Sequence, residues 1–224
     1  MKHTVILGSY NRPKMVARAI ESVFTQTVSD FQLIVTDDGS NTDTQESIRR
    51  ALGNDRRGLF LTVPHQDDSA ARPECANRAV QRINDAIPYV AGDIVHYLAD
   101  DDWYAPENFE AFNEVFSKEG VVAAYGRLEY FDGAGRPLGR TRYPEFVGDP
   151  LGVLDHNQVA HGRAVFERIP RWADAFDYAS EGHFFRAISK IWKFYGIDRV
   201  VAFKTEHDLN MSSTQSRSTG KREQ

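Results

Sequence analysis

The sequence contains little cysteine and no long apolar run. Cys75 is the one cysteine among 224 residues, so the chain forms no internal disulfide and offers no cysteine-rich zinc site. Such a composition fits a reducing compartment. No apolar run approaches the roughly 18 residues of a membrane-spanning helix, and residues 1–3 lead directly into an apolar segment, unlike a signal peptide. We therefore expect a cytoplasmic protein with no membrane span.

The sequence also lacks an excess of positive charge. It has 27 Lys and Arg residues against 32 Asp and Glu residues, a net charge of −5. A general nucleic-acid binder carries a basic face, so this class is not favoured. There is no internal repeat. With 41% hydrophobic residues, the chain is long enough for one large domain or a domain with a small appendage.

Short apolar segments alternate with segments of helical periodicity in the first half of the chain. The predicted strands are residues 4–7, 31–36, 59–63 and 93–98. The predicted helices are residues 13–24, 43–52, 74–86 and 106–117. This alternation is typical of an α/β protein with a largely parallel sheet whose faces are both covered.

The pattern changes after residue 121. Strands are predicted at residues 121–125 and 128–131, followed by a hairpin turn at 132–135 and a return strand. A loop is predicted at 143–152, a helix at 182–195 and a late strand at 200–203. Residues 212–224 are polar and contain no core-forming side chains, so we expect a frayed tail.

Carboxylates follow two of the predicted strands, at the point where each strand ends. Three of them, at residues 100–102, follow the strand at 93–98, and Asp37 and Asp38 follow the strand at 31–36. A divalent metal ion that carries a diphosphate would offset their repulsion, and Mg²⁺ and Mn²⁺ prefer such oxygen ligands. A solvated acidic loop is the alternative. Because both strand ends should meet in one crevice of the sheet, a nucleotide-bearing ligand is favoured.

These acidic turns belong to four motifs by which the chain resembles the family 2 glycosyltransferases. The motifs occur in the order and at the spacing of that family, at residues 5–12, 22–27, 35–40 and 98–106. The resemblance covers roughly residues 4–108. Weaker similarities extend it at residues 26–31, 155–156 and 184–185, and within the family the likeness is to glycosyltransferases of bacterial spore-coat polysaccharide.

The resemblance implies the GT-A fold, a Rossmann-like mixed and mainly parallel sheet with helices on both faces. It implies one domain over residues 1–211, with a nucleotide-sugar half of about 1–108 and an acceptor half of about 109–211. The implied enzyme uses Mn²⁺ or Mg²⁺ and moves a sugar from a UDP-sugar, or a dTDP-sugar, with inversion. The implied acceptor is a saccharide or another hydroxyl compound, and a nucleic-acid base is the less favoured acceptor.

Two other functions remain as alternatives. One is a nucleotidyltransferase that makes nucleotide-sugars; that class usually has a Gly-rich loop with a basic residue after the first strand, and residues 8–12 are a poor version of it. The other is a non-catalytic relative that binds nucleotide-sugars. Intact carboxylates at both strand ends argue against that relative.

The resemblance assigns nucleotide contacts to Gly8, Tyr10, Asp38, Arg72 and Asp100. Tyr10 would pack on the uracil or thymine ring, and Asp38 would accept a hydrogen bond from the ring N3–H. Asp100 would lie near the ribose or a metal-bound water. The family usually has a hydroxyl residue at the position of Gly8. The alternatives are an ordinary turn whose side chains bond the local backbone, for Asp37 and Asp38, and a solvated side chain for Arg72.

The same resemblance implies a metal site at Asp101, Asp102 and His207. Alignment on the aromatic pair that follows makes Asp101 the metal ligand and puts Ala99 where the family has its first acidic residue. In that register Asp102 is a supporting or helix-capping carboxylate. The other register makes Asp102 the ligand. For His207, a structural or exposed histidine is the alternative.

A general base is expected in the second half of the chain. Alignment on the Phe184–Phe185 pair assigns this role to Glu181, with Asp177 and Asp174 as substitutes. A glutamate that favours a helix N-terminus is the alternative. Residues expected to shape or line the acceptor pocket are His156, His161, Trp172, Phe176, Tyr178 and Trp192, although aromatic side chains at helical spacing usually belong to a core.

Overall fold

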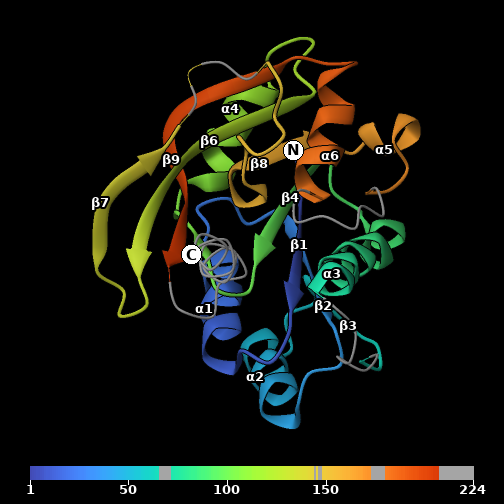
Figure 1. Ribbon diagram of the computed structural model, residues 1–224, viewed down its shortest axis with the longest axis vertical. Helices are drawn as coiled ribbons and strands as arrows, with labels where there is room; N and C mark the ends of the chain where they lie inside the picture. The colour runs from blue at the N-terminus through green and yellow to red at the C-terminus, as the bar shows by residue number, and fades with distance from the viewer. Residues whose placement is uncertain (66–71, 144, 146–147, 173–179, 207–224) are drawn as a thin grey trace, which may run out of the picture.

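The computed structural model describes residues 1–65, 72–143, 145, 148–172 and 180–206 (Figure 1). The predicted tail at 212–224 lies outside these residues, as do Asp174, Asp177 and His207. The side chains of residues 72–77, at the start of one helix, are not described either. No helix in the described ranges is long and apolar enough to cross a membrane.

Four parallel strands form the first half of the sheet, in the order β3-β2-β1-β4. Their bounds are β1 His3–Ser9, β2 Phe31–Asp37, β3 Gly58–Thr62 and β4 Ile94–Ala99. Every observed bound lies within two residues of the predicted one. The prediction of a parallel α/β sheet is confirmed for this half of the chain.

Helices cover both faces of the sheet, as predicted (Figure 1). One face packs against α1 Pro13–Phe24, α2 Thr42–Leu52 and α4 Asn108–Phe116. The other packs against α3 Arg72–Ala86, α5 Val165–Arg168 and α6 Ser180–Ser189. Two short 3-10 helices, η1 Ile87–Tyr89 and η2 His156–Gln158, lie in the connections.

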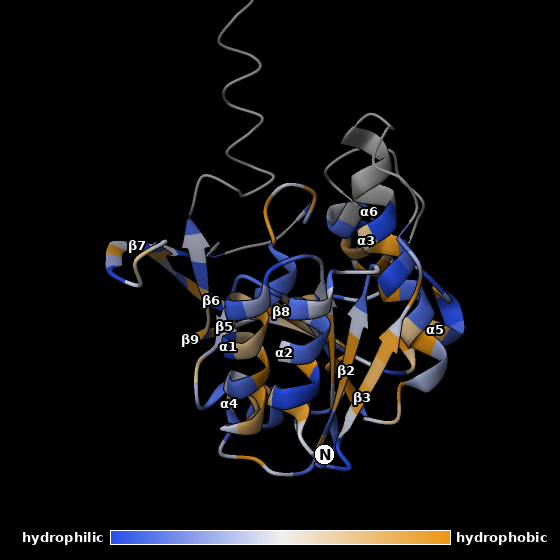
Figure 2. Cartoon of the chain, turned by 90° about the horizontal axis from the view of Figure 1, so that it is seen from below, coloured by the Kyte–Doolittle hydropathy of each residue, from blue (hydrophilic) through white to orange (hydrophobic). Residues whose placement is uncertain are grey.

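The period-two pattern of β1 explains why two cores form. Val5 and Leu7 point into the core beneath α1, whereas Ile6 between them points into the core beneath α3. All three side chains are at most 1% exposed. Figure 2 shows the same division in colour, with hydrophobic strands inside and hydrophilic residues on the outer side of α2.

Local signals set the ends of the helices on the first face. Pro13 begins α1, where its missing N–H would have no partner in any case. The side chain of Asn41 caps α2 by accepting a hydrogen bond from the Thr44 N–H at 3.0 Å. Gly53 ends the same helix with φ of 54°.

The second half of the sheet is mixed. Beyond β4 the order continues β8-β6-β9-β5, and β7 pairs with the outer part of β6. β8 runs antiparallel to both β4 and β6, whereas β9 runs parallel to β6. The bounds are β5 Trp103–Tyr104, β6 Ala123–Asp132, β7 Pro137–Arg142, β8 Val159–Gly162 and β9 Phe194–Glu206.

Two predictions for this half are wrong in detail. The strands expected at 121–125 and 128–131 are one strand, because Gly126 lets Val201 of β9 approach the backbone; a Cβ there would lie 2.3 Å from a Val201 methyl group. The helix expected at 182–195 ends at Ser189. From Phe194 onward the chain forms β9, which pairs in parallel with β6, so strand pairing rather than helical periodicity determines the structure there.

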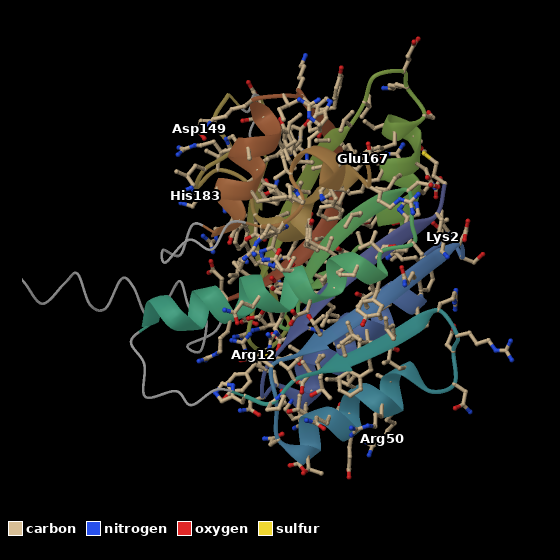
Figure 3. The ribbon with its side chains drawn as sticks, turned by 90° about the vertical axis from the view of Figure 1, so that its right-hand side faces the viewer. Lys2, Arg12, Arg50, Asp149, Glu167 and His183 are labelled. Atoms are coloured by element: carbon tan, nitrogen blue, oxygen red, sulfur yellow. The ribbon has the colours of Figure 1, made fainter. Side chains whose placement is uncertain are left out.

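The strand register brings the predicted acidic turns to one edge of the sheet. Gly8 lies opposite Thr36 of β2 and opposite Ala99 of β4, and Ser9 lies opposite Asp37. The turns that follow β1, β2 and β4 therefore meet. In Figure 3 this edge is marked by Arg12, on the opposite side of the molecule from Lys2 at the start of β1.

Three histidines among the described residues are buried. Nδ1 of His3 lies 2.9 Å from Nε2 of His96, and Nε2 of His161 lies 2.8 Å from the Tyr97 hydroxyl. Nδ1 of His161 lies 2.9 Å from the Gly162 carbonyl oxygen, so Nδ1 carries the proton and Nε2 accepts. Burial lowers the pKa of His3 and of His161 to about 4, and that of His96 well below 6.5.

We predict that His161→Gln flattens the acid side of the stability profile. The pKa of His161 is lowered in the folded state, so below about pH 6.5 the unfolded chain binds a proton that the folded chain does not. Unfolding in urea, measured from pH 6.5 down to pH 4.5, should show the wild type losing up to about 1.4 kcal/mol per pH unit relative to the variant. Parallel profiles would contradict the assignment of a neutral buried His161.

Candidate active site

The acidic turn after β4 is held together by contacts with the end of β1. Oδ2 of Asp100 accepts a hydrogen bond from the Tyr10 N–H at 3.0 Å, and Oδ1 accepts one from Nη1 of Arg12 at 2.8 Å. The same Nη1 lies 3.0 Å from Oδ2 of Asp101. Burial raises the pKa of Asp100 to about 6, although the charge of Arg12 opposes this. One guanidinium therefore serves two neighbouring carboxylates.

Asp102 faces the interior and is bound by other partners. Its side chain is 1% exposed. Oδ1 accepts a hydrogen bond from the Thr205 N–H at 2.7 Å, and Oδ2 accepts one from Nδ2 of Asn157 at 2.8 Å. Nζ of Lys204 lies 3.5 Å from the same Oδ2. Both oxygens of Asp102 thus have partners within the protein, and this carboxylate is built into the fold.

Lys204 places its ammonium group between two buried carboxylates. Its Nζ lies 2.7 Å from Oδ2 of Asp155 as well as near Asp102. Nδ2 of Asn157 joins the same two residues, because it also donates to Oδ1 of Asp155 at 2.7 Å. Burial would lower the pKa of Lys204, but Asp155 and Asp102 outweigh it and hold that pKa well above 10.5. The group is a compact buried charge cluster.

The acidic turn after β2 contains two carboxylates with different surroundings. Asp37 is fully buried, and its Oδ2 accepts hydrogen bonds from the Ser40 N–H at 3.0 Å and the Thr62 hydroxyl at 3.1 Å. This is the local turn bonding that was the alternative interpretation of these residues. Gly39 completes the turn with φ of 68°, and a Cβ at this position would lie 2.2 Å from the backbone nitrogen of His65.

Asp38 lies among cationic and aromatic side chains. Its Oδ2 is 2.9 Å from Nε of Arg78 and 3.1 Å from Nδ1 of His65, and its Oδ1 is 3.3 Å from Nη1 of Arg82. The ring of His65 stacks on that of Tyr10, with centroids 4.5 Å apart. The structure thus brings Tyr10 and Asp38 together through His65. Both arginines come from α3, the helix that begins at Arg72.

Glu181 lies in the first turn of α6 and is about one-third exposed, with a side-chain exposure of 31%. Its Oε1 is 3.9 Å from Nδ1 of His156. Burial lowers the pKa of His156, but Glu181 and Asp155 outweigh it and raise the pKa overall. His156 stands between Asp155 and Asn157 in η2, so this short helix links Glu181 to the charge cluster of Lys204.

The acceptor-pocket residues divide into two groups. His161 and Trp172 are at most 1% exposed and lie in the core, where the Trp172 ring stacks on Phe184 with centroids 5.1 Å apart. His156 and Trp192 are partly exposed. Phe176 and Tyr178 lie outside the described residues.

Asp100 and Asp101 are the carboxylates of this edge that could hold a metal ion. Within the described residues, no group of three His, Cys, Asp or Glu side chains is arranged to hold a metal ion. Mg²⁺ and Mn²⁺ commonly use one or two carboxylates, with waters and substrate phosphates as the other ligands. Two adjacent carboxylates at an open edge fit that demand. Asp102 fits it less well, because it is the most buried of the three carboxylates and its partners are Thr205, Asn157 and Lys204.

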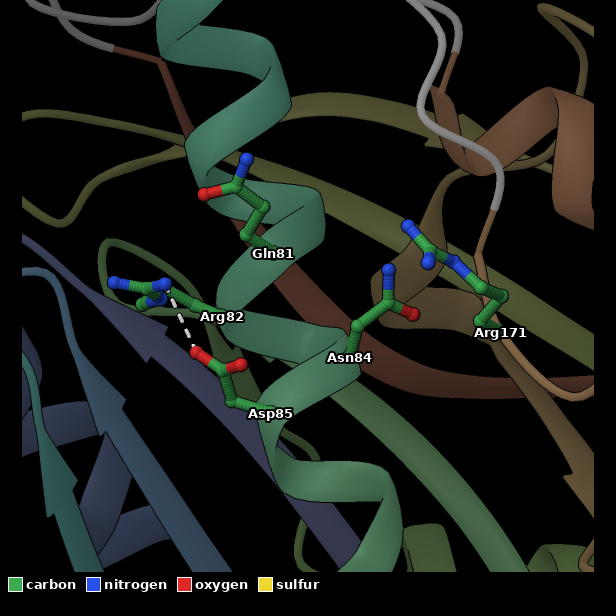
Figure 4. Close-up of a pocket in the computed structure, with 5 residues that line it drawn as sticks. All are labelled: Gln81, Arg82, Asn84, Asp85 and Arg171. Atoms are coloured by element: carbon green, nitrogen blue, oxygen red, sulfur yellow. Dashed lines mark ion pairs between the residues drawn. The ribbon is translucent and has the colours of Figure 1, made fainter.

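A separate surface cavity of about 330 Å³ lies beside α3 (Figure 4). Its lining is polar and charged, and consists of Gln81, Arg82, Asn84, Asp85 and Arg171. Arg82 bridges from this cavity to the acidic turn, because its Nη2 lies 2.9 Å from Asp85 while its Nη1 reaches Asp38. None of the carboxylates that follow β2 or β4 lines the cavity, which is therefore distinct from the acidic edge of the sheet.

The sequence profile of the Glycosyl transferase family 2 matches residues 4–168. This match covers most of the chain, which therefore belongs to glycosyltransferase family 2. Protein CgeD of Bacillus subtilis strain 168 is 30% identical over 212 residues, which are 89% of this chain and 49% of CgeD. The chain thus spans about half the length of that relative.

Solved structures support the fold. The crystal structure of S. aureus TarS 1-349 in complex with UDP-GlcNAc matches with a TM-score of 0.73 and 15% identity, over 96% of this chain and 61% of that one. Mannosyltransferase PcManGT from Pyrobaculum calidifontis, in complex with GDP-Man and Mn²⁺, matches with a TM-score of 0.67 and 15% identity, over 96% and 59%. The predicted GT-A fold is confirmed.

Sequence reasoning missed the partners of the carboxylates. Seven residues contact the predicted site residues without having been predicted to do so: Arg12, His65, Arg78, Arg82, Asn157, Lys204 and Thr205. One signal was available: the cluster of acidic residues requires cations nearby, and Arg12 stands in the motif that ends β1.

We predict that Lys204→Met destabilises the fold by about 3–5 kcal/mol, because Asp102 and Asp155 remain buried without their cation. Urea unfolding measures this. The control is Lys14→Met, which removes an exposed lysine and should change stability by about 0.5 kcal/mol or less. Adding Asp155→Asn to Lys204→Met should recover part of the loss. Equal stability of the two lysine variants would show that the ammonium is not needed there.

Proposed function

We propose that this chain is a metal-dependent, inverting glycosyltransferase that moves a sugar from a UDP-sugar, or a dTDP-sugar, to a hydroxyl group of a saccharide acceptor. The observation that supports this most is the meeting of Asp100, Asp101 and Arg12 at the carboxyl edge of the parallel strands. Ligands bind at this edge in open α/β sheets. The proposal assigns the donor to residues 1–108 and the acceptor to residues 109–211, within one domain.

Asp101, with Asp100 beside it, is the proposed holder of Mn²⁺ or Mg²⁺. The bound cation would offset the negative charge that grows on the leaving nucleoside diphosphate. A solved relative, PcManGT, contains Mn²⁺ together with GDP-Man, which supports a divalent cation in this fold. Asp102 is proposed as a supporting carboxylate, since its partners are Thr205, Asn157 and Lys204. His207 follows Lys204 by three positions and stays a candidate ligand.

The base of the donor is proposed to bind beside Tyr10 and Asp38, with Gly8 and Arg72 as further contacts. Tyr10 offers a flat aromatic surface for a pyrimidine ring. Asp38 offers carboxylate oxygens that can accept the ring N3–H, while Arg78 and Arg82 keep its charge balanced. TarS, a structural relative, binds UDP-GlcNAc, which supports a uridine nucleotide as the first donor to test.

Glu181 is the proposed general base. The acceptor hydroxyl would give its proton to this carboxylate while its oxygen forms the new bond to the anomeric carbon and the bond to the diphosphate breaks. His156 lies 3.9 Å from the carboxylate and would hold it in place. A single displacement on the face opposite the leaving group inverts the anomeric configuration. Asp177 and Asp174 remain the substitutes.

A panel of nucleotide-sugars tests this proposal. We expect UDP release from at least one UDP-sugar or dTDP release from a dTDP-sugar, with Mn²⁺ or Mg²⁺ present and a saccharide acceptor supplied. Formation of pyrophosphate from UTP and a sugar phosphate would identify a nucleotidyltransferase instead. Tight binding of nucleotide-sugars with no turnover across a broad acceptor set would identify a non-catalytic relative. The likeness to spore-coat polysaccharide glycosyltransferases suggests which acceptors to try first.

We predict that Asp101→Asn and Asp102→Asn separate metal binding from folding. Asp101→Asn should reduce metal-dependent transfer by about 10²-fold or more, since a ligand of the cation that stabilises the leaving group is lost, and should leave thermal unfolding nearly unchanged. Asp102→Asn should instead lower the unfolding temperature, because it disturbs a buried charge cluster. A milder loss of transfer in Asp101→Asn than in Asp102→Asn would favour the other register. Full turnover in excess chelator would refute metal dependence.

We predict that Glu181→Gln lowers transfer by about 10²–10⁴-fold while UDP and Mn²⁺ affinities stay nearly constant. The amide keeps the size of the side chain and loses its proton-accepting charge. Glu167→Gln, on the exposed surface of α5 (Figure 3), is the matched control and should retain full transfer. Proton NMR of the product should show an inverted anomeric centre. Near-normal transfer by Glu181→Gln would move the base elsewhere, and a retained configuration would overturn the single displacement.

A further inference from the structure

Arg12 occupies the carboxylates that the proposed metal ion requires. Its Nη1 is 2.8 Å from Oδ1 of Asp100 and 3.0 Å from Oδ2 of Asp101. Because both carboxylates are nearly buried, this guanidinium is a close counter-charge for each of them. A second cation that binds Asp101 must therefore share the carboxylate with Arg12 or displace it.

The backbone around Arg12 is fixed by the turn that follows β2. The preceding residue, Asn11, has φ of 51°, in the left-handed region that asparagine tolerates. Its N–H donates to Oγ of Ser40 at 2.9 Å, and its side-chain Oδ1 accepts from the Asn41 N–H at 2.9 Å. Arg12 therefore projects from an anchored turn, and what can change is the direction of its long side chain, which is 25% exposed.

Like charges at this distance oppose each other strongly. A divalent ion on Asp101 would lie within a few ångströms of the guanidinium, where unit charges near a protein surface interact by several multiples of the thermal energy. A diphosphate changes the balance, because arginine pairs well with phosphate oxygens. If the side chain moves to the diphosphate, it leaves Asp100 and Asp101 to the metal, and every charge keeps a partner.

We propose that Arg12 is an exchangeable counter-cation: it keeps the divalent metal off Asp100 and Asp101 until the diphosphate of the donor draws it away. This proposal rests on the proposed function, since it takes a nucleoside diphosphate and a divalent cation as the ligands. It assigns to Arg12 a role that a plain phosphate contact does not have. Metal and nucleotide then bind together, and the favourable effect of each on the other is reciprocal.

The test measures binding and needs no turnover. Mn²⁺ is titrated into the protein in the absence and in the presence of UDP, by calorimetry and by the electron paramagnetic resonance signal of free Mn²⁺. The proteins are the wild type, Arg12→Ala and the control Lys14→Ala, which removes an equal charge from an exposed position two residues further along. We expect Arg12→Ala to bind Mn²⁺ alone about tenfold more tightly or better than the wild type, and UDP alone more weakly. UDP should strengthen Mn²⁺ binding less in Arg12→Ala than in the wild type, and Lys14→Ala should match the wild type.

Each other outcome contradicts the proposal in a recognisable way. Unchanged Mn²⁺ affinity in Arg12→Ala, with weaker UDP binding, would make Arg12 a phosphate ligand only. Weaker Mn²⁺ binding would make it a structural support of the acidic turn. If Arg12→Ala does not fold, Arg12→Gln keeps a donor for Asp100, removes the charge and must show the same rise in Mn²⁺ affinity. Failure of the wild type to bind either UDP or dTDP, even with Mn²⁺, would refute the proposed function itself, whatever Arg12 does to the metal.

Discussion

The neutralisation of three adjacent carboxylates is the constraint on which the rest of this structure depends. Asp100, Asp101 and Asp102 follow one another at the end of β4, nearly buried, and would repel one another without partners. Two cations within the described part of the chain contact their carboxylate oxygens. Arg12 contacts the first two carboxylates from the end of β1, and Lys204 contacts the third from the end of β9. The turn therefore has an open side and a buried side.

This division of charge organises the surrounding elements. On the buried side, Thr205 and Asn157 donate to Asp102, so β9 and η2 are fixed against β4. Because His156 belongs to η2, the same contacts place it beside Glu181, 3.9 Å away. The contacts that neutralise Asp102 thus connect the turn after β4 with the start of α6, which lies much further along the chain. On the other side, Asp101 must share Oδ2 with Arg12 or give up that contact in order to take another ligand.

Much of the fold and the outline of the site were predictable from local patterns. The continuous apolar run at residues 5–7 is typical of a strand buried on both faces, and acidic residues after β2 and β4 indicate one polar edge. The partners of those residues were not predictable, because they are distant in sequence and common in type. Lys204 lies 102 residues from Asp102. The continuity of β6 through Gly126 was not predictable for a similar reason, since it depends on the approach of Val201 from β9.

The account stands on the claim that Asp101 exchanges Arg12 for a divalent metal when a nucleotide is present. A crystal structure of the protein with UDP and Mn²⁺, with data collected near the manganese absorption edge, measures this most directly. We predict an anomalous peak next to the carboxylate of Asp101 and the guanidinium of Arg12 on a phosphate oxygen. Bound UDP with a peak at Asp102, or with Arg12 still paired to Asp100 and Asp101, would contradict the account.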